Sequence, residues 1–186
     1  MKNISKTDNE NLQKIRTNVS SFIAEHSGSY DSKEVLVLDV APQDHEGAKP
    51  YFKYAKVETL DIDPDSGATY IADLCQNNEK IIPSNKFDVI ICTEVLEHTK
   101  QPFDAVNELK RILKPGGTAL VSTPYNLRIH GPLPDCWRFT EHGLRELFRD
   151  FETTDVKGLD DEHRFLMPVH YTTIARKRNV KKTTKS

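Results

Sequence analysis

The sequence predicts an α/β fold, built as a mostly parallel sheet with helices on both faces. Short apolar runs rich in β-branched residues alternate along the chain with segments of helical periodicity, which is the order that such a fold requires. The length of 186 residues suits one domain, expected over residues 1–178, with a basic tail at 179–186. In folds of this class, ligands bind beyond the carboxyl ends of the strands.

A helix and four strand candidates fill the first half of the chain. The helix is expected at about residues 6–26, because its apolar residues recur at three- and four-residue steps. The four strand candidates are EVLVLDV (34–40), KVETLDID (56–63), ATYIADL (68–74) and KFDVIICTEV (86–95). The first run has polar or helix-breaking residues on both sides, which is typical of a strand buried on both faces.

Two helices and three strands are expected in the second half. The clearest helix lies in QPFDAVNELKRILKPGG (101–117), where the apolar residues share one face and KPGG is expected to end the helix. The run TALVSTP (118–124) predicts a fifth strand. Thr140 is expected to cap a helix in TEHGLRELFRDF (140–151). The segment 152–176 then alternates enough for two strands, TTDVKGL and FLMPVHYTTIARK.

Composition argues against several classes of protein. No apolar run approaches the roughly 20 residues of a membrane span, and the N-terminus lacks the apolar core of a secretory signal. We therefore expect a cytoplasmic protein with no membrane partner. The three cysteines form no CxxC pair, which argues against a zinc site or a disulfide framework. The net charge of −2 argues against nucleic acid as a partner, although the basic tail could touch phosphates.

Acidic residues end three successive strand candidates, at Asp39, Asp61 and Asp73. The separation of the first two is close to the roughly 20 residues that place an acid on the ribose in nucleotide-binding folds. A carboxylate can accept two hydrogen bonds from a ribose diol. Asp73 could accept a hydrogen bond from an adenine amino group. The ordered series therefore favours a cofactor that contains adenosine.

The loop after Asp39 lacks the glycines that let a backbone approach a pyrophosphate. It contains Ala41, Pro42 and two acidic residues before its first glycine, Gly47. Proline has no N–H to donate, and the acidic residues would repel phosphate, so a dinucleotide or ATP fits poorly. A cofactor with adenosine, no phosphate and a positive centre fits better. S-adenosylmethionine meets this description.

Six segments follow one another in the order of known motifs: VLVLDV, TLDIDP, ADL, FDVIICTEVLEH, LKRILKPGGTALVSTP and WRFTEHGLRELF. Over about residues 34–150 the chain thereby resembles class I S-adenosylmethionine-dependent methyltransferases, and most of all a small bacterial branch with a Trp-Arg-Phe-Thr segment. The resemblance implies a Rossmann-like, seven-stranded sheet of order 3-2-1-4-5-7-6 with an antiparallel last strand. It also implies O- or N-methylation of a small-molecule acceptor.

The resemblance also assigns cofactor contacts by position. Asp39 and the loop after it would meet the methionine part, while Thr93 and Glu94 would line the pocket near the reacting methyl. The predicted cofactor-binding set is Asp39, Ala41, Gly47, Asp61, Ile62, Asp73, Leu74, Thr93 and Glu94. The family usually has glycine where this chain has Ala41 and Gln43. If φ is positive there, alanine costs roughly 1 kcal/mol or more.

His130 is the predicted catalytic base. A hydroxyl acceptor usually needs a base, and histidine side chains in general can exchange a proton near neutral pH. His130 follows the fifth strand on a proline-rich loop. A structural role for it is the alternative. Glu94, Glu97 and His98 resemble a divalent-metal motif of some related methyltransferases, with His130 as a fourth ligand. The same residues can make structural hydrogen bonds, and we predict no metal.

Three functions stay open at this point. The leading hypothesis is a small-molecule methyltransferase whose acceptor is covered by the N-terminal helix, by the loop at 125–139 or by a second subunit, so a homo-oligomer is not excluded. The second is a non-catalytic binding or scaffold protein, which the glycine-poor loop supports. The third is an RNA methyltransferase that uses the basic tail for phosphates.

Overall fold

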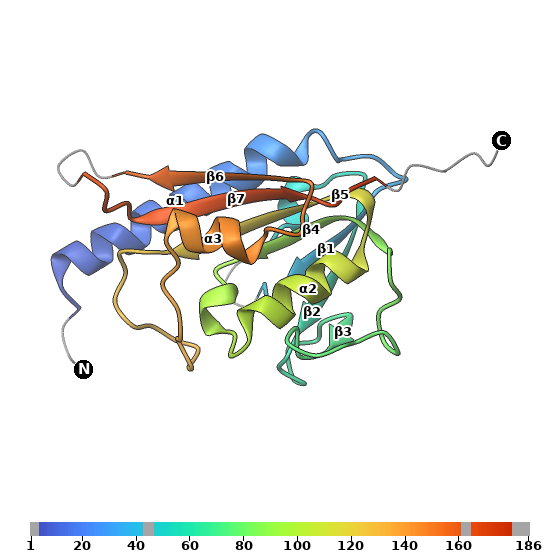
Figure 1. Ribbon diagram of the computed structural model, residues 1–186, viewed down its shortest axis with the longest axis horizontal. Coiled ribbons are helices and arrows are strands. Elements are labelled where there is room, and N and C mark those ends of the chain that lie inside the picture. Colours follow the sequence, from blue (N-terminus) through green and yellow to red (C-terminus); the bar gives the residue numbers. More distant parts are fainter. Residues whose placement is uncertain (1–3, 43–46, 161–164, 180–186) are drawn as a thin grey trace.

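Seven strands form one sheet in the order β3-β2-β1-β4-β5-β7-β6 (Figure 1). The computed structural model describes residues 4–42, 47–160 and 165–179. The strands are β1 Leu36–Val40, β2 Lys56–Asp61, β3 Tyr70–Ile71, β4 Phe87–Thr93, β5 Leu113–Pro124, β6 Thr153–Leu159 and β7 His170–Arg176. Only β7 runs antiparallel to its neighbours. The predicted strand order and the antiparallel last strand are confirmed.

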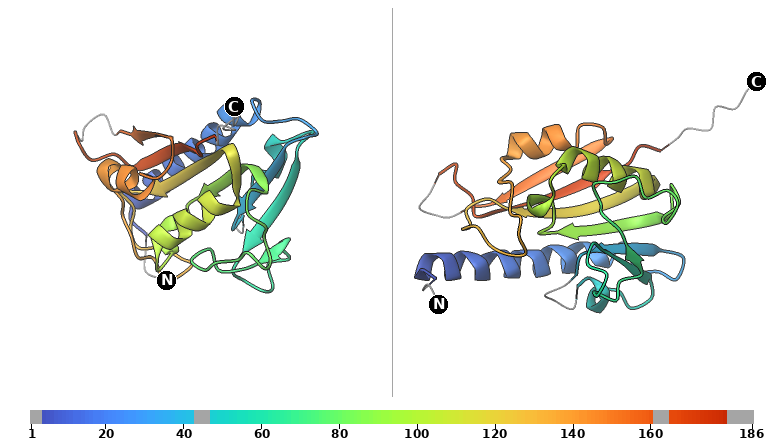
Figure 2. Two further views of the ribbon diagram at one scale, coloured as in Figure 1. Left: turned by 45° about the vertical axis from the view of Figure 1, so that its right-hand side comes forward. Right: turned by 90° about the horizontal axis from the view of Figure 1, so that it is seen from below.

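Three α-helices cover the sheet on its two faces. Helix α1 (Lys6–Ser27) lies on one face, and α2 (Pro102–Ile112) and α3 (Glu141–Leu147) lie on the other (Figure 2). The Thr140 side chain accepts a hydrogen bond from the backbone N–H of Gly143 at 3.1 Å, as expected of an N-cap. Two short 3-10 helices, η1 (Lys49–Tyr51) and η2 (Leu96–His98), follow β1 and β4.

Strand β4 is buried on both faces and separates two hydrophobic clusters. Val89 and Ile91 pack in the cluster that contains Phe22 of α1, whereas Ile90 packs in the cluster that contains Leu109 of α2. All three β4 side chains are 0% exposed. Successive side chains of a strand point to opposite faces, so a continuous apolar run suits a central strand with helices on both sides.

The segment KPGG does not end a helix in the way that the sequence predicts. Helix α2 stops at Ile112, and Leu113 already pairs with Phe87 of β4. A register shift then separates this pair from the next, and Gly117 lies in the shifted segment, where a Cβ would be 2.9 Å from the Lys114 carbonyl oxygen. The helix predicted in 101–117 is thus confirmed, but it ends before KPGG because Leu113 pairs with a distant strand.

The carboxyl ends of β1, β2, β4 and β5 meet at one edge of the sheet. The loop at 125–139 leaves β5 at this edge and passes beside the N-terminal half of α1, at the left of Figure 1. Asn11 of α1 donates a hydrogen bond to the Asn126 carbonyl oxygen of that loop at 2.9 Å. Within the described residues, no helix is long and apolar enough to cross a membrane. Apart from its first residue, the basic tail expected at 179–186 lies outside the described residues.

Candidate active site

Asp39 at the end of β1 holds the loop that follows. Its side chain is buried, and Oδ2 accepts a hydrogen bond from the Ala48 N–H at 2.6 Å. Burial raises the pKa of Asp39 to about 6. Gly47 has φ +61°, and a Cβ there would lie 2.3 Å from Asp39 Oδ2. Only glycine leaves room for the Asp39 carboxylate at this position, so Gly47 has a defined structural role in the loop.

Ala41 occupies the left-handed region of backbone space, with φ +51°. Its N–H donates to the Leu60 carbonyl oxygen at 2.7 Å, so β2 holds this conformation. The cost of roughly 1 kcal/mol expected for alanine at positive φ therefore applies at this position. The part of the loop at 43–46 lies outside the described residues.

The other predicted cofactor residues lie beside Ala41 at the same edge. Parallel pairing of β1 with β2 matches Val40 with Leu60, which puts Asp61 next to Ala41. Asp61 Oδ1 accepts the Asp63 N–H at 2.8 Å, and Asp73 Oδ1 accepts the Cys75 N–H at 2.8 Å. Both carboxylates thus shape their own turns and reach the edge where ligands of this fold bind.

The remaining members of the predicted set differ in exposure. Ile62 is 66% exposed, whereas the Leu74 side chain is buried in the core, so Leu74 can meet a ligand at this edge only through its backbone. Thr93 ends β4 and is half-buried. Glu94 follows it with φ +56°, and its side chain turns toward β5 and β7. These assignments stay predictions.

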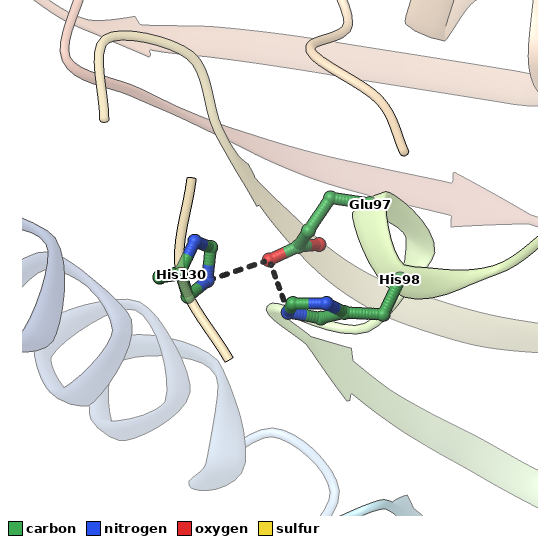
Figure 3. A group of neighbouring side chains, drawn as sticks. All are labelled: Glu97, His98 and His130. Carbon is green, nitrogen blue, oxygen red and sulfur yellow. Dashed lines mark ion pairs between the residues drawn. The ribbon is translucent and has the colours of Figure 1, made fainter. Parts of the chain in front are cut away.

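Glu97, His98 and His130 form a second group at the end of β4 (Figure 3). Their ligand atoms lie within 4.8 Å of one another. The Nε2 atoms of His98 and His130 are 3.7 and 3.8 Å from Glu97 Oε1. Glu97 is 0% exposed, and within the described structure neither of its carboxylate oxygens has a hydrogen-bond partner. Burial, and then the charge of Glu94, raises the pKa of Glu97 well above its usual range.

Backbone hydrogen bonds fix this group between η2 and the loop at 125–139. The N–H groups of Cys136 and Trp137 donate to the Glu97 carbonyl oxygen at 2.7 and 3.2 Å. The Trp137 indole N–H donates to the Thr99 carbonyl oxygen at 2.8 Å. The loop is therefore clamped onto η2, which brings His130 against residues more than 30 positions earlier in the chain.

Each of the two histidines has its second ring nitrogen next to an oxygen atom. His98 Nδ1 is 3.0 Å from the Pro134 carbonyl oxygen, and His130 Nδ1 is 3.1 Å from Asp135 Oδ2. Arg138 binds both carboxylate oxygens of Asp135, which lowers the pKa of Asp135 to about 2. The sequence placed Asp135 in the acceptor loop but did not predict that its carboxylate accepts the His130 backbone N–H.

A sequence comparison decides what kind of protein this is. The chain matches the methyltransferase domain family over residues 13–174. It is a class I S-adenosylmethionine-dependent methyltransferase domain. The cofactor of this methyltransferase is therefore S-adenosylmethionine, as the acidic series and the glycine-poor loop predicted. Which of the predicted residues touch it stays a prediction.

Relatives of this methyltransferase include ubiquinone biosynthesis O-methyltransferases. The one from Actinobacillus pleuropneumoniae is 39% identical over 71 residues, which cover 38% of this chain and 29% of the relative. The one from Xanthomonas campestris is 28% identical over 92 residues, which cover 48% of this chain and 34% of the relative. The similarity thus spans about a third of the relatives' length.

Solved structures share the fold of this methyltransferase. The Burkholderia thailandensis 1,6-didemethyltoxoflavin-N1-methyltransferase, with 1,6-didemethyltoxoflavin and S-adenosylhomocysteine bound, is 18% identical. The structural match covers 93% of this chain and 84% of the Burkholderia protein, with a TM-score of 0.63. An S-adenosylmethionine-dependent methyltransferase from Methanosarcina mazei is 15% identical. The match covers 82% of this chain and 97% of that protein, with a TM-score of 0.59.

Replacing Ala41 with glycine should not destabilise the methyltransferase. Glycine relieves the left-handed strain but gains entropy in the unfolded chain, so we expect a change in the free energy of unfolding between zero and a gain of about 1 kcal/mol. Ala55→Gly is the matched control, because Ala55 has no positive φ. Its free energy of unfolding should fall by about 0.5–1 kcal/mol. Urea denaturation measures both. An equal loss in the two variants would contradict the strain at Ala41.

Replacing Asp39 with asparagine should change how stability depends on pH. Because the folded pKa is about 6 and the ordinary value is 3.8, the folded state holds the proton more tightly. Asp39 therefore contributes to the free energy of unfolding below pH ~4, and this contribution is lost as the pH rises through 6. The free energy of unfolding of Asp39→Asn, relative to wild type, should therefore rise by roughly 1–3 kcal/mol between pH 4 and 7.

Asp31→Asn is the control of opposite sign. Asp31 accepts backbone N–H groups from Lys53, Tyr54 and Ala55, and these bonds lower its pKa. Its stabilisation is present above the unfolded pKa and is lost as pH falls, so this variant should be less stable than wild type at pH 7. If the difference in free energy of unfolding between Asp39→Asn and wild type stays constant from pH 4 to 7, Asp39 has an ordinary pKa.

Proposed function

We propose that this methyltransferase methylates a hydroxyl group of a small-molecule acceptor. The sulfonium methyl is already activated, so an amine or thiolate acceptor needs mainly alignment, whereas a hydroxyl must also lose its proton. The observation that supports a hydroxyl is the Glu97, His98 and His130 group, because it puts proton-binding side chains beside the strand ends. The relatives named O-methyltransferases point in the same direction.

We propose further that Glu97, His98 and His130 hold a divalent cation. Metal-bound histidines usually have their second nitrogen fixed by an oxygen, as the Pro134 carbonyl oxygen does for His98. A buried carboxylate without hydrogen-bond partners is costly unless a cation pairs with it. When bound, such an ion would lower the pKa of an acceptor hydroxyl. The sequence analysis expects no metal, and the chelator experiment below decides between that expectation and this proposal.

The surrounding residues position the acceptor side of the site. Asp135, paired with Arg138, accepts the His130 backbone N–H at 3.0 Å and so holds His130 beside Glu97. Trp137 stacks on Phe139 with ring centroids 6.2 Å apart and stays 41% exposed, which provides a flat apolar wall. An apolar wall beside a polar cluster suits a small molecule with a hydroxyl on an apolar body.

A second mechanism uses the same residues without a cation. In it, His130 takes the acceptor proton itself, and the Asp135 carboxylate, 3.1 Å from Nδ1, stabilises the positive charge that the ring then carries. The short distance between this carboxylate and the ring supports the second mechanism. In both mechanisms, His130→Gln should lower kcat about 10²–10⁴-fold.

Removing divalent cations should separate the two mechanisms. We expect a chelator to abolish methyl transfer and Mn²⁺ to restore it. We also expect Mn²⁺ to raise the Tm of wild type and not that of Glu97→Gln. In chelator, Glu97→Gln should melt at or above the wild-type Tm, because it removes a buried, unpartnered carboxylate. Full activity in excess chelator would leave His130 as the base.

Cofactor binding should depend on Asp61. Asp61→Ala should weaken S-adenosylhomocysteine binding by about 1.5–3 kcal/mol, the scale of charged hydrogen bonds, as measured by calorimetry. Asp65→Ala is the control, since Asp65 is exposed on the same turn. Unchanged affinity in Asp61→Ala would remove Asp61 from the ribose role. No binding by wild type at millimolar ligand would favour the scaffold alternative.

A further inference from the structure

A row of polar side chains runs from α1 through β7 to the end of β4. The Asn18 side-chain nitrogen is 2.8 Å from His170 Nδ1, and His170 Nε2 is 2.6 Å from Glu94 Oε1. Ser122 of β5 also donates to Glu94 Oε1, at 2.8 Å. His170 is 0% exposed, whereas the Glu94 side chain is 24% exposed. The row therefore links a buried histidine to a carboxylate that reaches the site.

The hydrogen bonds in this row have a fixed direction. The Asn18 amide nitrogen can only donate, so His170 Nδ1 accepts and the ring proton lies on Nε2. His170 then donates this proton to Glu94 Oε1. Asn18 thus selects the His170 tautomer that Glu94 requires. A side chain at 18 without a donor would remove that selection.

The row acts on a residue in an unusual backbone conformation. Glu94 has φ +56°, a backbone conformation that residues other than glycine rarely adopt. Its N–H donates to the Ser122 carbonyl oxygen at 3.1 Å, so the backbone and the side chain are both tied to β5. Strained residues persist only where their surroundings hold them, and they concentrate at functional sites. The fold therefore fixes the direction of the Glu94 carboxylate.

We infer that His170 is a positioning residue, which holds the Glu94 carboxylate so that its negative charge faces the sulfonium of S-adenosylmethionine. This inference rests on the proposed methyltransferase function and on the position of Glu94 near the reacting methyl, which the family resemblance implies. Both hydrogen bonds described here end on Oε1, so they orient the carboxylate through one oxygen. Asn18 acts one step further away, through the ring of His170.

The charge of Glu94 then distinguishes the cofactor from its product. S-adenosylmethionine and S-adenosylhomocysteine share the adenosine and the amino-acid group, and they differ by the methyl and the positive charge on sulfur. A fixed carboxylate near the sulfur attracts only the cation, so it favours binding of the methyl donor over binding of the spent product. Loss of the charge on methyl transfer then helps the product to leave.

The ratio of the two affinities tests this inference. Calorimetry on the full chain should give S-adenosylmethionine binding that is about 10-fold weaker in Glu94→Gln, with S-adenosylhomocysteine binding changed by less than about twofold. His170→Phe should shift the ratio in the same direction. His170→Gln should recover part of it, since a glutamine amide can donate to Glu94. Once Glu94 is glutamine, His170→Phe should add no further change to the ratio.

Asn18→Leu and Asn11→Leu form a matched pair on α1. Both asparagines donate across to another segment, but Asn11 donates to Asn126 and lies outside the row. Asn18→Leu should lower the preference for S-adenosylmethionine, while Asn11→Leu should lower only the Tm. An unchanged ratio in Glu94→Gln, or equal weakening of both ligands in His170→Phe, would overturn the inference. Absence of S-adenosylhomocysteine binding in wild type would instead overturn the placement of the cofactor.

Discussion

The burial of β4 on both faces is the constraint on which the rest of the site depends. Because Val89, Ile90 and Ile91 are packed by helices on either side, the end of the strand has almost no freedom to move. The left-handed turn at Glu94 and the 3-10 helix η2 begin from this fixed point. The loop at 125–139 is in turn bound to η2 through the Glu97 carbonyl oxygen. The side chains that follow β4 are therefore positioned by the core, and those of the loop at 125–139 are positioned by the core through η2.

The strand ends divide the edge of the sheet into two parts with different chemistry. The ends of β1 and β2 and the turn after β3 carry carboxylates that suit an adenosine cofactor without phosphate. The end of β4 and the loop after β5 carry imidazoles, a buried carboxylate and an exposed indole, which suit the acceptor. Glu94 lies at the border, since its backbone follows β4 and its side chain is held from β5 and β7. In the arrangement proposed above, this position lets Glu94 respond to the charge at the sulfur.

Several features of the site cost stability. Ala41 and Glu94 have positive φ, Asp39 is buried with a raised pKa, and Glu97 has two buried oxygens without hydrogen-bond partners among the described residues. None of these costs is needed to close the sheet, which is stabilised by the two apolar clusters. Such costs persist where the surrounding structure can bear them and a ligand recovers them. Their concentration at one edge is consistent with a site shaped for a cationic cofactor and a polar acceptor group.

The sequence by itself determined the order and type of the elements, because periodicity, caps and strand-end residues are local. The acidic residues at three strand ends and the missing glycines of one loop also sufficed to predict S-adenosylmethionine, since residue type and spacing along the chain carry that signal. Tertiary structure decided what depends on distant segments. The end of α2 depends on the pairing of Leu113 with Phe87, and the conformation of Ala41 depends on β2. Asn18 and His170 are separated by 152 positions, and His170 and Glu94 by 76. No local pattern encodes such a contact, because it exists only once the sheet has brought α1, β7 and β4 together.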